Sequence, residues 1–126
     1  MQIRKLDHVN IRTTRLDAMV DWYERVLGLQ RGDRPNFPFS GAWMYVGDHP
    51  VVHLVGIDGG PATGSETTLK LEHFAFSATD RPAFEAKLTE LGEAYRISVV
   101  PDFGITQYNV WDPDGNHIHI DFVGEG

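Results

Sequence analysis

The sequence predicts an α+β fold built from two copies of one βαβββ module, about residues 1–57 and 69–124, within a single domain of 126 residues. The first observation behind this prediction is an internal repeat: Leu6–Ile11 (LDHVNI) returns as Leu71–Phe76 (LEHFAF), sixty-five residues later. The second is a helix pattern after each copy, which ends both times on Leu-Gly. The third is a run of three short strand patterns after each helix.

A helix is expected directly after each copy of the repeat. In the first half, Thr14 can cap a run of apolar residues with helical spacing, and Gly28 ends the run. In the second half, Thr79 or Asp80 can cap the helix, and Gly92 ends it. The two halves therefore share the order strand, then helix.

Three strands are expected after each helix. They lie at roughly 29–33, 41–46 and 50–56 in the first half, and at roughly 94–99, 105–111 and 116–123 in the second. Turns at 47–50 and 112–115 separate the last two strands of each half, and residues 58–68 form a linker rich in Gly, Pro, Ser and Thr. One module alone would leave one face of its sheet uncovered. The modules are therefore expected to pair with pseudo-twofold symmetry, as a curved mixed sheet around a cleft.

Composition excludes several classes of protein. The net charge is −7, without the basic patch that a nucleic-acid binder needs, so neither nucleic acid nor an anionic membrane is expected as a partner. The chain has no cysteine, which excludes disulfides, thiolate metal ligands and cysteine nucleophiles. No apolar run of about 18 residues predicts a membrane span, and the N-terminus lacks the apolar stretch of a signal peptide. We therefore expect a cytoplasmic protein.

Histidines gather on one face of the predicted sheets. Side chains alternate along a strand, so if Val9 and Ile11 lie under the helix, His8 faces the other way. The same alternation assigns these further residues to the open faces: Asn10, Arg12, His53, His73, His117, His119 and Asp121. His8, His53, His73 and His119 fall on repeat-equivalent strands, and they predict a site for one divalent metal ion. His49 falls in a turn, where a solvated side chain is expected.

These features resemble the vicinal oxygen chelate superfamily, which includes glyoxalase I, extradiol dioxygenases, epimerases and bleomycin-resistance proteins. The resemblance covers nearly the whole chain and is most specific at LDHV (Leu6–Val9), WYERVLGL (Trp22–Leu29) and DPDGN (Asp112–Asn116). It implies two βαβββ modules around a metal cleft, with ligands from the first and fourth strands of each module. Those positions are His8, His53, His73 and His119. Small bacterial relatives share their sites across a homodimer, which is the assembly expected here.

The ligand set departs from the family pattern. Glyoxalase I has Glu at the positions of His53 and His119, and extradiol dioxygenases and epimerases usually have Glu at that of His119. The carboxylate in the glyoxalase site also moves the proton, so its absence leaves that role open. Asp121, on the same predicted face as His119, is the first candidate for the role, and Tyr108 is a weaker one.

Four neutral imidazoles would leave the full charge of the ion in place and two adjacent coordination positions open. We expect an enzyme that chelates a small substrate through two vicinal oxygens, with Fe, Zn, Ni, Mn or Co as the metal. Its chemistry would be that of a lyase or isomerase, or of a ring-cleaving oxygenase. The candidate substrate-binding residues are Asn10, Arg12, Trp43 and His117. The alternative is a bleomycin-resistance-like binding protein without catalysis, although such relatives dispense with the metal.

Overall fold

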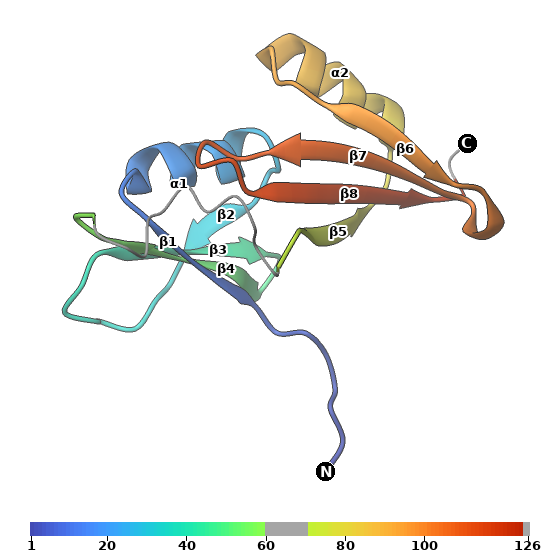
Figure 1. The fold of residues 1–126 in the computed structure, drawn as a ribbon. Coiled ribbons are helices and arrows are strands. Elements are labelled where there is room, and N and C mark those ends of the chain that lie inside the picture. The colour runs from blue at the N-terminus through green and yellow to red at the C-terminus, as the bar shows by residue number, and fades with distance from the viewer. Residues whose placement is uncertain (60–70, 125–126) are drawn as a thin grey trace. The chain divides into compact units, whose positions relative to one another are not determined.

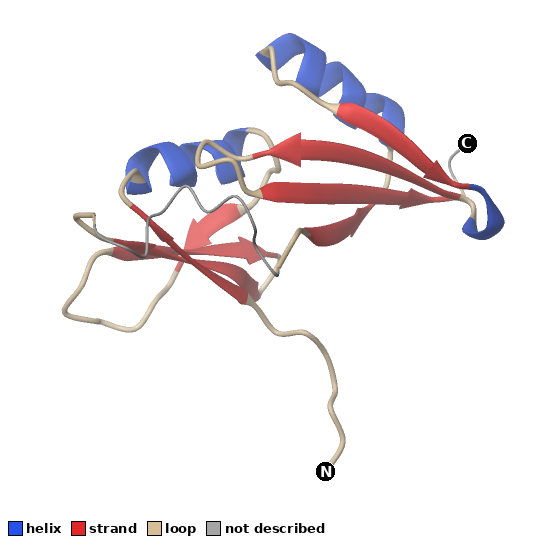
Figure 2. Ribbon diagram, viewed as in Figure 1, coloured by secondary structure: helices blue, strands red, loops and turns tan. Residues whose placement is uncertain are grey.

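The computed structural model describes residues 1–59 and 71–124, which form two compact units. Each unit has the element order βαβββ (Figures 1 and 2). The predicted fold class and the internal repeat are thereby confirmed. The predicted linker, residues 58–68, falls mostly outside the described residues. No helix in the described part of the chain is long and apolar enough to cross a membrane.

The first unit is a four-stranded mixed sheet with one helix packed on it. Its elements are β1 (Val9–Thr13), α1 (Leu16–Arg25), β2 (Gln30–Gly32), β3 (Gly41–Val46) and β4 (His49–Gly56). The strand order is β1-β4-β3-β2, with β1 parallel to β4 and the other pairs antiparallel. Met19 and Tyr23 of α1 are fully buried, as are Met44 of β3 and Val52 of β4. This apolar layer between helix and sheet leaves the other face of the sheet open for polar residues.

The second unit repeats this topology. Its elements are β5 (Phe74–Ala78), α2 (Arg81–Leu91), β6 (Arg96–Val100), the short 3-10 helix η2 (Pro101–Phe103), β7 (Ile105–Trp111) and β8 (His117–Val123). The strand order is β5-β8-β7-β6, with β5 parallel to β8. Leu88 of α2 is buried, together with Tyr108, Ile118 and Phe122 of the sheet. The helix is the crossover that a parallel strand pair requires.

Strand register makes the parallel strand pairs of the two units equivalent in position. Val9 lies opposite Val52 in the first unit, and Phe74 lies opposite Ile118 in the second. His8 directly precedes Val9, and His73 directly precedes Phe74. On the partner strands, His53 directly follows Val52, and His119 directly follows Ile118. The parallel strand pair in each unit therefore holds two histidines at matching positions.

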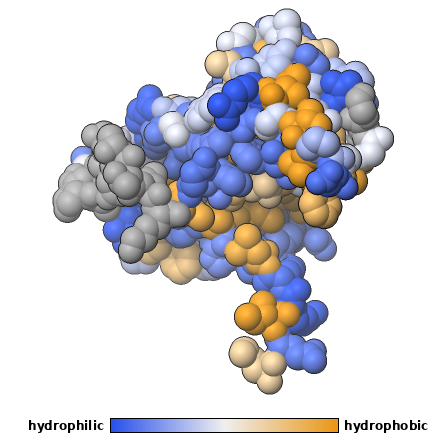
Figure 3. Space-filling view, turned by 45° about the vertical axis from the view of Figure 1, so that its right-hand side comes forward, coloured by the Kyte–Doolittle hydropathy of each residue, from blue (hydrophilic) through white to orange (hydrophobic). Residues whose placement is uncertain are grey.

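The ends of several elements differ from the sequence prediction. The N-cap of α1 is Arg15 rather than Thr14, and Thr13, the last residue of β1, accepts the Arg15 N–H through its hydroxyl at 2.9 Å. Strand β4 begins at His49, so the preceding turn is shorter than expected. The first strand begins at Val9, and Ile3 and Leu6 in the segment before it are exposed. This N-terminal segment carries hydrophobic surface at the lower end of the space-filling view (Figure 3). The N-cap of α2 is Asp80, one of the two predicted candidates, and its carboxylate accepts the Ala83 N–H at 3.3 Å.

Candidate metal centre

His8 and His53 form a stacked imidazole pair in the first unit. Their ring centroids lie 3.8 Å apart and their planes differ by 10°. His8 directly precedes β1, and His53 lies in β4 opposite Asn10, so the parallel pairing of these two strands brings the rings together. His53 is buried, with 8% of its surface exposed, whereas His8 is exposed.

His73 and His119 repeat this arrangement in the second unit. Their ring centroids are 3.9 Å apart, with an angle of 12° between the planes. His73 directly precedes β5, and His119 lies in β8 opposite Ala75. The four histidines that the sequence singled out therefore form two equivalent pairs, one in each unit. Imidazole is a good ligand for zinc and for the later first-row transition metals.

A carboxylate holds the exposed histidine of each pair. Asp7 accepts a hydrogen bond from Nδ1 of His8 at 2.8 Å, and Glu72 accepts one from Nδ1 of His73 at 2.5 Å. These bonds are the largest cause of the lowered pKa of both carboxyl groups. With the proton fixed on Nδ1, the Nε2 atom of each ring keeps its lone pair. Metal-binding histidines commonly have this partner on the other ring nitrogen.

The buried histidine of each pair favours the neutral form. Burial is the main cause of the lowered pKa of His53, and the neighbouring His8 lowers it further. Burial also lowers the pKa of His119, followed by the charges of His73 and His117. A lowered pKa keeps these rings neutral at neutral pH, the form in which an imidazole can bind a metal ion.

Two buried polar atoms near His119 lack a hydrogen-bond partner among the described residues. They are Nδ1 of His119 itself and Oδ1 of Asp121, two residues further along β8 on the same face. A buried polar atom without a partner costs about 1–3 kcal/mol. A cation bound by Nδ1 of His119 would offset that cost, so the histidines fit a divalent metal ion.

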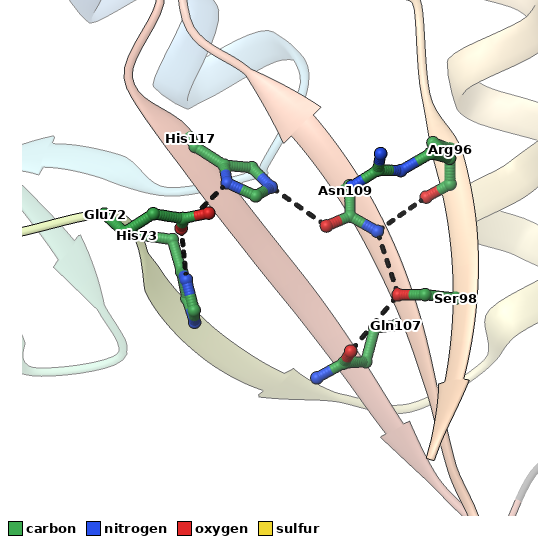
Figure 4. A network of polar contacts seen from close by, with 7 residues as sticks. All are labelled: Glu72, His73, Arg96, Ser98, Gln107, Asn109 and His117. Atoms are coloured by element: carbon green, nitrogen blue, oxygen red, sulfur yellow. Dashed lines mark hydrogen bonds and ion pairs between the residues drawn. The ribbon is translucent and has the colours of Figure 1, made fainter. Parts of the chain in front are cut away.

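His117 completes a cluster of three histidines in the second unit. One ring nitrogen from each of His73, His117 and His119 lies within 4.8 Å of the others. Nε2 of His117 donates to Oδ1 of Asn109 at 2.9 Å, and its Nδ1 lies 3.2 Å from Oε2 of Glu72 (Figure 4). Sequence reasoning missed Glu72 and Asn109 as site residues. The available signal was the acidic residue before the histidine in both copies of the repeat.

Trp43 lies beside the histidine pair of the first unit. It is opposite His53 in the β3–β4 register, and the two rings stack with centroids 4.0 Å apart. Asn10 and Arg12 lie on β1 opposite His53 and Val55, and both are exposed. The open face of this unit thus combines an aromatic surface with two polar side chains, as the sequence suggested.

Tyr108 does not lie with the histidines. It is opposite Ile120 in the β7–β8 register, on the face that α2 covers, and it is fully buried. Its hydroxyl donates to Glu85 at 2.7 Å and accepts from Arg81 at 2.9 Å. The proton-transfer role suggested for Tyr108 is therefore corrected: alternation along β7 puts it on the helix side, where it ties α2 to the sheet. Asp121 lies on the same face as His119, as expected.

The sequence and the structure of this protein are similar to those of known proteins. The family model described as the Glyoxalase/Bleomycin resistance protein/Dioxygenase superfamily matches residues 5–120. A protein of Arabidopsis thaliana named Glyoxylase I 4 is 30% identical over 125 residues, which cover 95% of this chain and 71% of that protein. A glyoxylase/bleomycin resistance protein/dioxygenase domain from Frankia sp. superposes with a TM-score of 0.78 at 23% identity, covering 97% of this chain and 99% of its own. A glyoxalase family protein from Bacillus anthracis gives 0.77 at 20% identity and 98% coverage of both chains.

Proposed function

The chain belongs to the glyoxalase/bleomycin resistance protein/dioxygenase superfamily, and we propose that it is a metal-dependent enzyme acting on a small substrate with two adjacent oxygens. The observation that carries this proposal is the repeated histidine pair. Two units of the same topology each present two stacked imidazoles, and in each pair a carboxylate fixes one ring. Packing needs alone would not place the same polar pair in both halves.

His8, His53, His73 and His119 would hold the ion. When bound, a divalent metal would supply the positive charge that favours the anionic form of a catechol, hydroxy-ketone or enediol. A binding protein of the bleomycin-resistance type has no use for this ligand set. The retained histidines therefore favour an enzyme over that alternative.

Asp121 would take or return the substrate proton. Its Oδ1 is buried and has no hydrogen-bond partner within the described residues, on the same strand face as His119. A carboxylate oxygen that accepts no hydrogen bond from the described residues could accept a proton from a substrate bound beside it. The role is chemically distinct from that of a ligating glutamate, which this chain lacks at both fourth-strand positions.

Trp43, Asn10 and Arg12 would bind the rest of the substrate. Trp43 offers a flat apolar surface next to His53, suited to a planar or apolar substituent. Asn10 can donate and accept hydrogen bonds, and Arg12 can pair with a carboxylate. His117 lies beside His73 and His119 in the second unit, where Asn109 and Glu72 hold its ring.

Metal analysis and substrate turnover test the proposal. The full chain, purified without oxygen, is loaded separately with Fe²⁺, Zn²⁺, Ni²⁺, Mn²⁺ or Co²⁺, and bound metal is measured for wild type, His8→Ala and His73→Ala. Glu90→Gln, at an exposed residue of α2, is the control. Wild type and control should bind the ion, and both ligand variants should lose most of it. Unchanged metal content in His8→Ala and His73→Ala would contradict the proposal.

Turnover then separates the reaction classes. A panel of catechols, α-hydroxy-ketones and α-keto acids is tested with each metal form, while oxygen consumption is recorded. Oxygen uptake that requires Fe²⁺ indicates ring cleavage or a related oxygenation. Turnover without oxygen indicates lyase or isomerase chemistry. Tight binding of small ligands with no turnover under any metal would favour the non-catalytic alternative.

A further inference from the structure

We propose that a hydrogen-bonded chain running through Asn109, His117 and Glu72 positions His73 for metal binding, and that His117 is a positioning residue rather than a ligand. The inference rests on the proposed function, because the ion in question is the one that His73 would bind. Three histidines, His73, His117 and His119, each have one ring nitrogen within 4.8 Å of the others, and they thereby have different roles. Figure 4 shows the chain of contacts.

The series of hydrogen bonds begins at Asn109, whose side-chain amide has a fixed orientation. Asn109 is buried, with 1% of its surface exposed. Its Nδ2 donates to the carbonyl oxygen of Arg96 at 2.9 Å and to Oγ of Ser98 at 3.1 Å. A carbonyl oxygen only accepts, so the amide cannot be turned round without losing that bond. Oδ1 of Asn109 is thereby committed to the side facing His117.

His117 has both ring nitrogens engaged. Nε2 donates to Oδ1 of Asn109 at 2.9 Å, and Nδ1 lies 3.2 Å from Oε2 of Glu72. Trp111 also stacks on the ring, with centroids 5.3 Å apart and planes 11° apart. Since Nε2 donates to Asn109 and Nδ1 faces Glu72, both ring nitrogens are already occupied by protein groups. Nε2 of His73 and Nδ1 of His119 have no such partner among the contacts of the described residues.

Glu72 transmits this order to His73. The same oxygen, Oε2, faces both His117 and Nδ1 of His73. The Glu72 side chain is 69% exposed, so without His117 it would sample other rotamers. Held in place, its carboxylate keeps the proton of His73 on Nδ1 and leaves Nε2 as the atom that can bind the ion.

The first unit lacks this chain. The residue opposite His53 is Trp43, where the residue opposite His119 is Asn109. By the same strand register, Val51 stands where the second unit has His117. Asp7 instead has His49 beside it, whose Nε2 donates to the Asp7 carbonyl oxygen at 2.9 Å. The polar chain is thus a feature of the second histidine pair.

The test measures Zn²⁺ affinity and the tautomer of His73 in the full chain. Affinity is obtained by competition with a chromophoric chelator, and the tautomer by ¹⁵N–¹H NMR of the metal-free protein. Glu72→Gln should weaken Zn²⁺ binding about 10–100-fold, the usual effect of losing such a partner, and should release His73 from its Nδ1–H form. Glu72→Asp keeps a carboxylate, as at Asp7 in the first unit, and should restore much of both. Glu90→Gln, an exposed residue of α2, removes the same charge and should change neither.

His117→Phe separates a positioning residue from a ligand. The ring is retained for stacking on Trp111 while both hydrogen bonds are lost, so we expect weaker Zn²⁺ binding than wild type at unchanged stoichiometry. His73→Ala should lose far more. A loss in His117→Phe equal to that in His73→Ala would make His117 a ligand and overturn the proposal, as would an unchanged His73 tautomer in Glu72→Gln. A wild-type chain that binds no metal would instead refute the proposed function, and the tautomer measurement would still decide this inference.

Discussion

Trp43 lies flat against His53, with ring centroids 4.0 Å apart and an angle of 12° between the planes. His53 in turn stacks on His8, so the indole is the outer layer of a three-ring stack. Phe37 approaches the indole at a centroid distance of 6.5 Å. The candidate ligands of the first unit therefore have an optical reporter within contact distance.

Binding of a paramagnetic ion at His53 should quench the fluorescence of Trp43. Co²⁺ or Ni²⁺ added to the metal-free protein should lower the emission, because an open-shell ion a few ångströms away opens a non-radiative route. Zn²⁺ should bind without comparable quenching. In Trp43→Phe the quenching should decrease, and the part that remains should come from Trp111, which stacks on His117 beside the second histidine pair. Undiminished quenching in Trp43→Phe would place the ion elsewhere.

Replacing Asp121 should separate catalysis from metal binding. Asp121→Asn keeps the size of the side chain and removes the base. We expect kcat to fall about 10²–10⁴-fold, the usual contribution of a positioned acid or base, while Zn²⁺ affinity stays near that of wild type. Rates are measured on the substrate identified in the panel, with metal content determined on the same samples. Glu90→Gln is the control for loss of one negative charge. Full activity in Asp121→Asn would remove Asp121 from the mechanism.

Acid stability should depend on Glu85. The hydroxyls of Tyr108 and Tyr95 donate to its carboxylate at 2.7 and 3.1 Å, and these bonds lower the pKa of Glu85 from its ordinary value of 4.5. As the pH falls, the unfolded chain takes up this proton first. The stability that Glu85 contributes is therefore complete above about pH 4.5 and is lost as the pH falls through the lower pKa of the folded state.

Urea unfolding from about pH 7 to about pH 3 measures this effect. Glu85→Gln should be less stable than wild type at neutral pH and should show a smaller further loss on acidification. Glu93→Gln, an acidic residue just beyond the end of α2, is the control and should follow the wild-type slope. Parallel pH profiles for wild type and Glu85→Gln would show that the two tyrosines do not hold the ionised carboxylate.

The fold could be predicted from the sequence because strand alternation and helix ends are local signals. Strands β3 and β7 begin and end where predicted, since a turn signal follows each of them, at Gly47 and at Asp112. The alternation of side chains along a strand groups the histidines on one face of each sheet. Applied to β7, the same alternation places Tyr108 with Ile120 under the helix.

The polar partners could not be predicted in this way. Glu72 and His117 are 45 residues apart, and their contact depends on the rotamer of an exposed side chain. Asn109 shows no pattern in the sequence that distinguishes it from any other polar residue of a strand. The acidic residue before each repeated histidine was visible, but its bond to the ring depends on the chain preceding the strand. Local periodicity thus predicts which face a residue takes, and tertiary contacts decide its partner.

A homodimer with shared metal sites is the remaining prediction, and a mixing experiment tests it. Each unit carries one histidine pair, so His8→Ala damages the first pair and His73→Ala the second. If each site combines the first unit of one chain with the second unit of another, a heterodimer of the two variants has one site with both lesions and one with none. Differently tagged chains, purified as heterodimers, should then regain Zn²⁺ binding approaching half of the wild-type value. If each site lies within one chain, both sites carry one lesion and nothing is regained.

An isologous twofold dimer is the commonest assembly of identical chains, and sharing would make metal binding depend on association. Wild-type Zn²⁺ affinity should then fall on dilution below the dimer dissociation constant, whereas a site within one chain would keep its affinity.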